Sequence, residues 1–272
     1  MRGVVTRRRV RQIRDGATAE RADDLVAEEP MEIRVDGARV AVTMRTPGAD
    51  FDLALGFCLT EGIVDDPDEV ATIRYCPDPG MDQRYNLVDV RRRTALPVEA
   101  RLRRDLPISS ACGICGTASI DEVRARGGDV SADPVVVTGP VIAALPDRLR
   151  QAQRVFARTG GLHAAGLFTP DGELLCLRED VGRHNAVDKV LGWAARDGRL
   201  PVRGTILMVS GRVAFEIVAK GLVAGVPVLA AVSAPSSLAV SAADAAGMTL
   251  VGFVRGASMN VYTGAHRIVG TS

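Results

Sequence analysis

The chain has 272 residues, of which 47% are hydrophobic and 25% charged, and its formal net charge is +1. This composition is typical of a globular protein with enough apolar residues for a sizeable core, arranged as one large domain or two smaller ones. The near-neutral charge gives no reason to expect DNA or RNA as a partner, and no segment approaches the ~20 apolar residues that a membrane-spanning helix needs.

The cysteines and the N-terminal arginines bear on the compartment. Five cysteines in a chain of this length do not make a disulfide scaffold, which has more cysteines in a shorter chain, so a reducing cytoplasm fits better. Residues 1–14 are rich in arginine. No apolar stretch follows them, so we expect neither a signal peptide nor a twin-arginine export signal.

The N-terminal part predicts an arm followed by a small α+β unit. Residues 1–30 are basic and then acidic, and we expect a flexible or edge arm. Alternating residues on both sides of Asp36-Gly37 predict a β-hairpin. Asp50 is placed to cap a helix that ends near Thr60. Cys58 falls on the apolar face of this helix, so we expect it in the core.

Two strands with outward arginines, expected over 84–91 and 95–102, complete this unit. Residues 31–107 therefore form a predicted α+β subdomain, and a connector over 108–139 joins it to the rest.

Residues 140–272 predict a second unit. The expected helices are 140–159, 184–196, 214–224 and 236–246, and the expected strands are 162–168, 174–178, 205–209, 226–232, 249–254 and 258–262. The strands after Thr205 are continuous apolar runs, which need a sheet covered on both faces. The prediction is a three-layer α/β/α domain whose strand-end loops gather along one edge, where such domains bind ligands.

The most informative short run is Ser-Ser-Ala-Cys-Gly-Ile-Cys-Gly over 109–116, which holds Cys112 and Cys115. Its glycines let the loop swing and leave the sulfurs little to pack against. A zinc site is disfavoured because no second ligand pair accompanies this one. A thioredoxin-like redox pair is disfavoured because the helical pattern after it is short. A persulfide-forming sulfur carrier and two inert thiols also remain open.

Two further groups of residues indicate ligand binding. Asp180, Arg183, His184 and Asn185 crowd the predicted start of a helix, where free backbone amides bind anions. Arg183 can form a bidentate contact with phosphate or carboxylate, whereas Asp180 and Asn185 can equally be helix caps.

The second group, Ser210-Gly211-Arg212, lies between a strand and a helix. The Glu216 and Lys220 that follow it are also an ordinary i,i+4 helix pair.

Taken together, these motifs resemble the formate dehydrogenase accessory sulfurtransferases, the FdhD family. The resemblance covers nearly the whole chain from about Met31. It rests on the double-cysteine run, on Glu-Asp-Val-Gly-Arg-His-Asn-Ala-Val-Asp-Lys over 179–189, on residues 210–212 and on the tail 252–262. The double cysteine alone is a weak signal, but its combination with 179–189 is specific.

The resemblance implies a function and its residues. Members of the family take sulfur as a persulfide from a cysteine desulfurase. They deliver it to the molybdenum cofactor, bis-molybdopterin guanine dinucleotide, which the catalytic subunit of formate dehydrogenase needs; a homodimer is the family expectation. Cys112 corresponds to the persulfide carrier and Cys115 to its partner. The segment associated with cofactor binding corresponds to Phe253, Val254, Arg255, Gly256, Ala257 and Ser258.

Physical roles for other residues follow from this expectation. Arg183, Arg212 and Arg255 are the positive charges that we expect to face the cofactor's pyrophosphates. His184 is a candidate for proton handling, because its unperturbed pKa lies near neutrality.

The family's fold is similar to that of the cytidine deaminases, which predicts a deaminase-like three-layer domain with a mixed sheet. A zinc deaminase carries His-x-Glu and Pro-Cys-x-x-Cys at two helix starts. Here those places hold His184-Asn185-Ala186 and Ser210-Gly211-Arg212, so we expect neither zinc nor deamination. Two alternative functions remain: a cofactor chaperone that moves no sulfur, and a dithiol oxidoreductase.

Overall fold

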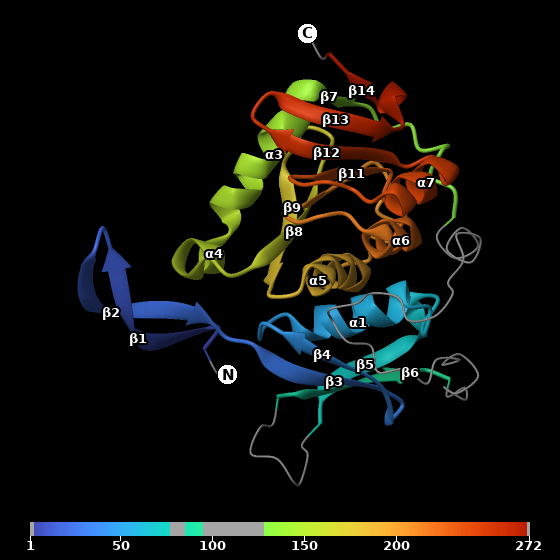
Figure 1. The fold of residues 1–272 in the computed structure, drawn as a ribbon. Coiled ribbons are helices and arrows are strands. Elements are labelled where there is room, and N and C mark those ends of the chain that lie inside the picture. Colours follow the sequence, from blue (N-terminus) through green and yellow to red (C-terminus); the bar gives the residue numbers. More distant parts are fainter. Residues whose placement is uncertain (1–2, 77–84, 95–127, 271–272) are drawn as a thin grey trace.

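The computed structural model describes residues 3–76, 85–94 and 128–270, and Figure 1 shows how they are arranged. A hairpin stands out to one side, a four-stranded sheet with one helix forms the N-terminal unit, and a six-stranded sheet between helices forms the C-terminal unit. The fold class is mixed α/β, as predicted. The strand expected over 95–102 lies outside the described residues.

The N-terminal arm is an ordered hairpin where a loose segment was one of the expectations. Strands β1 (Val5–Arg14) and β2 (Ala17–Val26) pair antiparallel and are joined by Asp15-Gly16. Both linking residues have positive φ, 48° and 80°, as a two-residue primed turn requires. The Asp-Gly dipeptide that predicts the hairpin at Asp36-Gly37 is therefore present here too. The many charged residues around Asp15-Gly16 had favoured the prediction of an arm over that of a hairpin.

The N-terminal unit is a sheet with the strand order β4-β3-β6-β5, covered on one face by α1 (Asp50–Thr60). Its strands are β3 (Glu29–Val35), β4 (Ala38–Arg45), β5 (Val70–Tyr75) and β6 (Leu87–Arg92), with a short 3-10 helix at Pro67–Glu69. Met31, Ile33 and Val35 alternate along β3 and pack in one core with the apolar residues of α1. Cys58 lies in this core, as predicted.

The predicted cap of α1 is wrong. The residue before the helix, Ala49, is left-handed (φ 54°) and no side chain caps the helix. The carboxylate of Asp50 instead accepts two hydrogen bonds from the guanidinium of Arg45, at 3.1 and 3.0 Å. Because both side chains are buried, this ion pair fixes the β4–α1 connection against the sheet.

The C-terminal unit is a six-stranded mixed sheet, ordered β13-β12-β11-β10-β8-β9. Its strands are β8 (His163–Phe168), β9 (Leu174–Asp180), β10 (Ile206–Val209), β11 (Val228–Ala231), β12 (Thr249–Arg255) and β13 (Ser258–Thr263). Strands β10, β11 and β12 run parallel, and the outer pairs are antiparallel. A small separate ladder joins β7 (Val137–Thr138) to β14 (Ile268–Val269), next to a 3-10 helix at Ala265–Arg267.

Helices cover both faces of this sheet, which gives the predicted three layers. One face packs on α5 (Arg183–Arg196), α6 (Phe215–Val223) and α7 (Ser237–Ala245), and the other on α3 (Gly139–Ala152). The single helix expected over 140–159 is interrupted at Gln153, and α4 (Arg154–Thr159) follows. The likeness to cytidine deaminases stays a prediction.

The two units meet where α1 crosses α5 at very short range (Figure 1). A Cβ on Gly56 would lie 1.9 Å from the carbonyl oxygen of Asp188, and a Cβ on Gly192 would lie 1.8 Å from that of Asp52. The two backbones therefore touch, which only glycine permits.

Candidate functional site

The predicted site residues gather along one edge of the six-stranded sheet. His163 begins β8 directly beside Asp180, the last residue of β9. The antiparallel pairing of β8 with β10 places the end of β10, and the following Ser210, at the same edge. Strand β12 runs parallel to β10 through β11, so the end of β12 also reaches this edge.

Arg183 and His184 open helix α5 at this edge. The residue before them, Gly182, has extended backbone and no side chain caps the helix, so the first backbone amides are directed outward. The Nε atom of Arg183 and the Nε2 atom of His184 are buried and have no hydrogen-bond partner among the described residues. This end of α5 offers positive charge and unsatisfied polar groups to an anion.

The turn after β10 closes against the same place. The hydroxyl of Ser210 accepts a hydrogen bond from the backbone N–H of Ala164 at 2.9 Å. A Cβ on Gly211 would lie 3.3 Å from Nδ1 of His163 and 3.8 Å from Cδ of Arg183, so this glycine lets the three residues approach. Arg212 is exposed beside them. The structure thus brings together two of the three arginines that were expected to face phosphate.

The two histidines are held in their neutral forms. Burial, followed by the charge of Lys220, lowers the pKa of His184 to about 4. Burial, followed by the charge of Arg183, also lowers the pKa of His163. The reason for assigning proton handling to His184, a pKa near neutrality, therefore does not hold. At neutral pH His184 is an uncharged polar group.

The expected cofactor segment 253–258 spans the end of β12, the β12–β13 turn and the first residue of β13, and it lies three strands away from β8, about 14 Å at the usual strand spacing. Phe253 has a left-handed backbone (φ 53°) at an irregularity in the β12–β13 pairing and is 39% exposed. Val254 is fully buried in the core, so its side chain is not available to a ligand. Arg255, Gly256, Ala257 and Ser258 are exposed at the tip.

Most of the run 179–189 is occupied by structural contacts. Glu179 accepts hydrogen bonds from the backbone N–H groups of Val155 and Phe156, at 3.0 and 2.8 Å, and so caps α4. Asp180 accepts from the N–H of Gly182 and from the side chain of Asn185. Asp180 and Asn185 therefore stabilise the turn before α5, and neither caps the first backbone amides of the helix.

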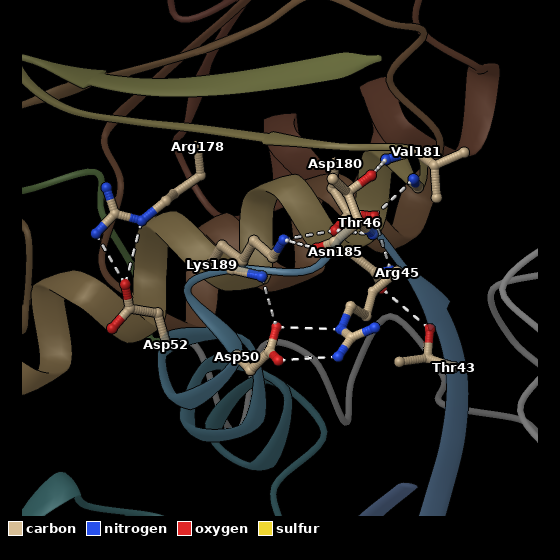
Figure 2. A network of polar contacts seen from close by, with 12 residues as sticks. Thr43, Arg45, Thr46, Asp50, Asp52, Arg178, Asp180, Val181, Asn185 and Lys189 are labelled. Atoms are coloured by element: carbon tan, nitrogen blue, oxygen red, sulfur yellow. Dashed lines mark hydrogen bonds and ion pairs between the residues drawn. The ribbon is translucent and has the colours of Figure 1, made fainter. Parts of the chain in front are cut away.

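Figure 2 shows how this run is tied to the N-terminal unit. Lys189 lies 2.7 Å from the carboxylate of Asp180 and donates to the carbonyl of Thr46 at 2.8 Å. The N–H of Thr46 donates to Asp180, and its hydroxyl accepts from the N–H of Val181. Within the run 179–189, Arg183 and His184 have buried polar atoms that find no hydrogen-bond partner in the described part of the chain.

A second buried cluster joins α1, α5 and α6. The ammonium of Lys220 lies 2.9 Å from Asp188 and donates to Thr60 at 2.8 Å and to Glu61 at 3.1 Å. The i,i+4 partner suggested for Lys220, Glu216, is not its ion-pair partner, and one oxygen of Glu216 is buried without a hydrogen bond among the described residues. Sequence reasoning missed Asp188 and Lys189. The signal was their position among the apolar residues of Ala-Val-Asp-Lys-Val-Leu, where charge must be paired.

Cys112 and Cys115 lie outside the described residues. Of the three described cysteines, Cys58 and Cys176 are buried and Cys76 is partly exposed. Burial raises the pKa of Cys58 far above its usual range and that of Cys176 to about 12, so neither is a ready thiolate.

The described ranges hold no group of three or more His, Cys, Asp or Glu side chains arranged for a metal ion. No helix within them is long and apolar enough to cross a membrane.

Comparisons with known proteins show which family the sequence matches. The sequence model of the FdhD/NarQ family matches residues 26–269. Relatives from Streptomyces avermitilis and Streptomyces coelicolor, each named "Sulfur carrier protein FdhD", are 56% and 54% identical over 270 residues, which is 97% of this chain and 96% of each relative. A relative of the same name from Mycobacterium tuberculosis is 52% identical over 272 residues, 96% of this chain and 97% of its own.

The fold also has a solved counterpart. The crystal structure described as a formate dehydrogenase accessory protein from Desulfotalea psychrophila matches with a TM-score of 0.78 at 23% identity, over 98% of this chain and 100% of that one. At this identity the likeness concerns the fold. The family match and the near full-length relatives, together with the motifs above, show that this chain belongs to the FdhD/NarQ family.

Proposed function

We propose that this chain is a sulfur carrier that serves formate dehydrogenase in the cytoplasm, as a homodimer. It accepts persulfide sulfur from a cysteine desulfurase. It transfers that sulfur to bis-molybdopterin guanine dinucleotide before the cofactor enters the catalytic subunit of formate dehydrogenase. The observation that carries the proposal is the 50–56% identity, over nearly the whole chain, to relatives named as sulfur carriers.

The correspondence with the family's persulfide-carrying cysteine assigns Cys112 as the carrier. Its thiolate attacks the outer sulfur of the desulfurase persulfide, forming Cys112–S–SH and releasing the desulfurase thiolate. With the cofactor present as acceptor, attack by the Cys115 thiolate on the inner sulfur releases the outer sulfur to it as sulfide and leaves a Cys112–Cys115 disulfide, which a cellular dithiol reduces before the next turn. The raised pKa values of Cys58 and Cys176 support assigning the chemistry to the other thiols.

The cofactor is the substrate of this reaction, and the sheet edge offers contacts for it. Arg183, Arg212 and the uncapped start of α5 supply positive potential in one place, and Arg255 supplies it on the exposed β12–β13 turn. The cofactor carries two guanine dinucleotides, each with a pyrophosphate, so two separated positive regions suit it. His184, neutral at pH 7, would serve as a hydrogen-bonding group for the cofactor.

Replacing the carrier thiol tests the proposal. The Cys112→Ser protein, incubated with desulfurase and cysteine, should lack the adduct of about 32 Da that one sulfur atom adds. It should also fail to restore formate dehydrogenase activity in a deletion strain. Cys76→Ser is the matched control and should keep both. Restored activity in Cys112→Ser would favour the chaperone alternative. A Cys112–Cys115 disulfide in the unaltered protein, together with no adduct on Cys112 in a Cys115→Ser protein, would favour the oxidoreductase.

The phosphate contacts can be tested separately with GDP as the probe. Because a hydrogen bond to a charged group contributes ~1.5–3 kcal/mol, the Arg183→Gln variant should bind GDP at least about tenfold more weakly in calorimetry. The control is Arg199→Gln, which removes an exposed guanidinium just beyond the C-terminal end of α5. This variant should bind GDP as the unaltered protein does. Equal affinity of all three proteins would remove Arg183 from the site.

A further inference from the structure

The hairpin β1–β2 has one edge toward the body and one open edge. Figure 1 shows the hairpin standing out from both sheets. Strand β2 lies toward α4, since Asp24 pairs with Arg158 at 2.9 Å and a Cβ on Gly161 would lie 3.4 Å from the side chain of Val26. Within the part of the chain that the structure describes, β1 pairs with β2 alone. The open edge therefore belongs to β1.

This open strand carries exposed positive charge. Four of its arginines are exposed and form no ion pair within the described ranges: Arg8, Arg9, Arg11 and Arg14. Arg8 faces Asp23, which already pairs with Arg21, and Asp24 pairs with both Arg7 and Arg158, whereas Arg11 faces Glu20 across the ladder without an ion pair. An apolar side chain, Ile13, is 70% exposed on the same strand.

The backbone of β1 is also available at this edge. The carbonyl of Val4 accepts a hydrogen bond from the N–H of Ala27 at 2.8 Å, and hydrogen-bonded pairs alternate along an antiparallel ladder. The N–H groups of Arg7, Arg9 and Arg11 therefore point away from β2. Side chains alternate as well, so Arg9 and Arg11 lie on one face of the ribbon and Arg8 and Arg14 on the other.

We propose that the open edge of β1 binds an extended acidic segment of a partner protein, which adds to the hairpin as a third strand. Such a segment pairs with the free N–H and C=O groups, and its alternating acidic side chains meet arginines on both faces. A two-stranded ribbon is marginally stable by itself, and a third strand reinforces it. Nucleic acid is the less suitable partner, because it cannot form a strand ladder and would need the arginines on one face.

The test uses the full chain and a labelled probe peptide. The probe is a fluorescein-labelled ten-residue peptide of glutamate, valine and threonine with acids at odd and even positions, titrated at low salt. Arg9 and Arg14 face Ala22 and Ala17 across the ladder, so the double variant R9Q/R14Q loses edge charge without losing a cross-strand partner. It should bind the peptide roughly tenfold more weakly, as expected for two exposed charge pairs. The matched control R154Q/R203Q, two exposed arginines elsewhere, should bind unchanged.

Hydrogen exchange gives the readout specific to strand addition. Bound peptide should slow exchange of the amides of Arg7, Arg9 and Arg11, while the even-numbered amides, already paired with β2, change little. Ile13→Pro, which removes an outward N–H and no charge, should weaken binding. Three results would overturn the proposal: equal weakening in the control double variant, peptide binding without protection of the odd-numbered amides, or tighter binding of a ten-nucleotide single-stranded RNA to the same edge. None of them depends on sulfur transfer, so this proposal and the proposed function fail separately.

Discussion

His184 and Asp188 lie one turn apart on α5 and shift the pH dependence of stability in opposite directions. Burial lowers the pKa of His184 to about 4, so the unfolded chain binds a proton below about pH 6.5 while the folded chain does not. Stability from this residue is present at neutral pH and is lost as the pH falls to 4. Burial raises the pKa of Asp188 to about 6, so the folded chain binds that proton first and gains stability between about pH 6 and 4.

Replacing His184 separates the two effects. Relative to the unaltered protein, His184→Gln should become more stable by about 2–3 kcal/mol as the pH is lowered from 7 to 4.5, because one proton bound only by the unfolded chain changes the free energy of unfolding by ~1.4 kcal/mol for each step of one in pH. Urea unfolding at the two pH values measures this. His266→Gln, at an exposed histidine, should follow the unaltered protein. Parallel stability profiles for His184→Gln and the unaltered protein would show that burial does not perturb His184.

At the scale of elements, the crossing of α1 and α5 depends on two glycines. A methyl group on Gly56 would enter the carbonyl of Asp188, and backbone cannot move aside as a flexible side chain can. We expect Gly56→Ala to lower the free energy of unfolding by about 3 kcal/mol, measured by chemical denaturation.

A helical glycine elsewhere provides the matched control. Gly221 lies in α6, and a Cβ there would make ordinary contacts at 3.4 Å or more. Gly221→Ala should therefore be neutral or stabilising by up to ~1 kcal/mol, because alanine loses less backbone entropy in a helix. If both variants were equally stable, the helices would have room to separate and the crossing would not hold the two units together.

At the scale of the whole molecule, Lys220 ties three helices from both units. It is buried and bonds to Asp188 of α5 and to Thr60 and Glu61 at the end of α1. Lys220→Met leaves the carboxylate of Asp188 in the interior without its cation, which typically costs ~3–5 kcal/mol. Denaturation followed by Trp193 fluorescence and by circular dichroism should show one transition, shifted to lower denaturant.

Arg21→Gln is the control for Lys220→Met. It breaks an ion pair whose partners are 47% and 38% exposed, so it should cost less than ~1 kcal/mol. A Lys220→Met protein as stable as this control would show that Asp188 can be protonated in the interior with little loss of stability. The Lys220–Asp188 ion pair would then not contribute to holding the two units together.

Local patterns predicted much of the fold and located the candidate site. Residue periodicity and turn residues act over a few positions, so they placed the strands and helices of residues 140–272 within a few residues of their bounds. They also placed Arg183, His184 and Ser210-Gly211-Arg212 at strand and helix ends, where the sheet topology then brought them together. The resemblance carried by 179–189 led to the family that the comparisons show.

The remaining features needed contacts between residues far apart in the chain. Thr46 bonds to Asp180 across 134 positions, and Lys220 bonds to Thr60 across 160; no local pattern records either contact. The burial that lowers the pKa of His184 follows from the packing of α5 on its neighbours. The same packing gives Asp180 structural partners and leaves buried polar atoms of Arg183 and His184 without partners among the described residues. The order of strands and helices could therefore be predicted from the sequence. The protonation state and role of each charged residue depended on which distant groups the fold placed beside it.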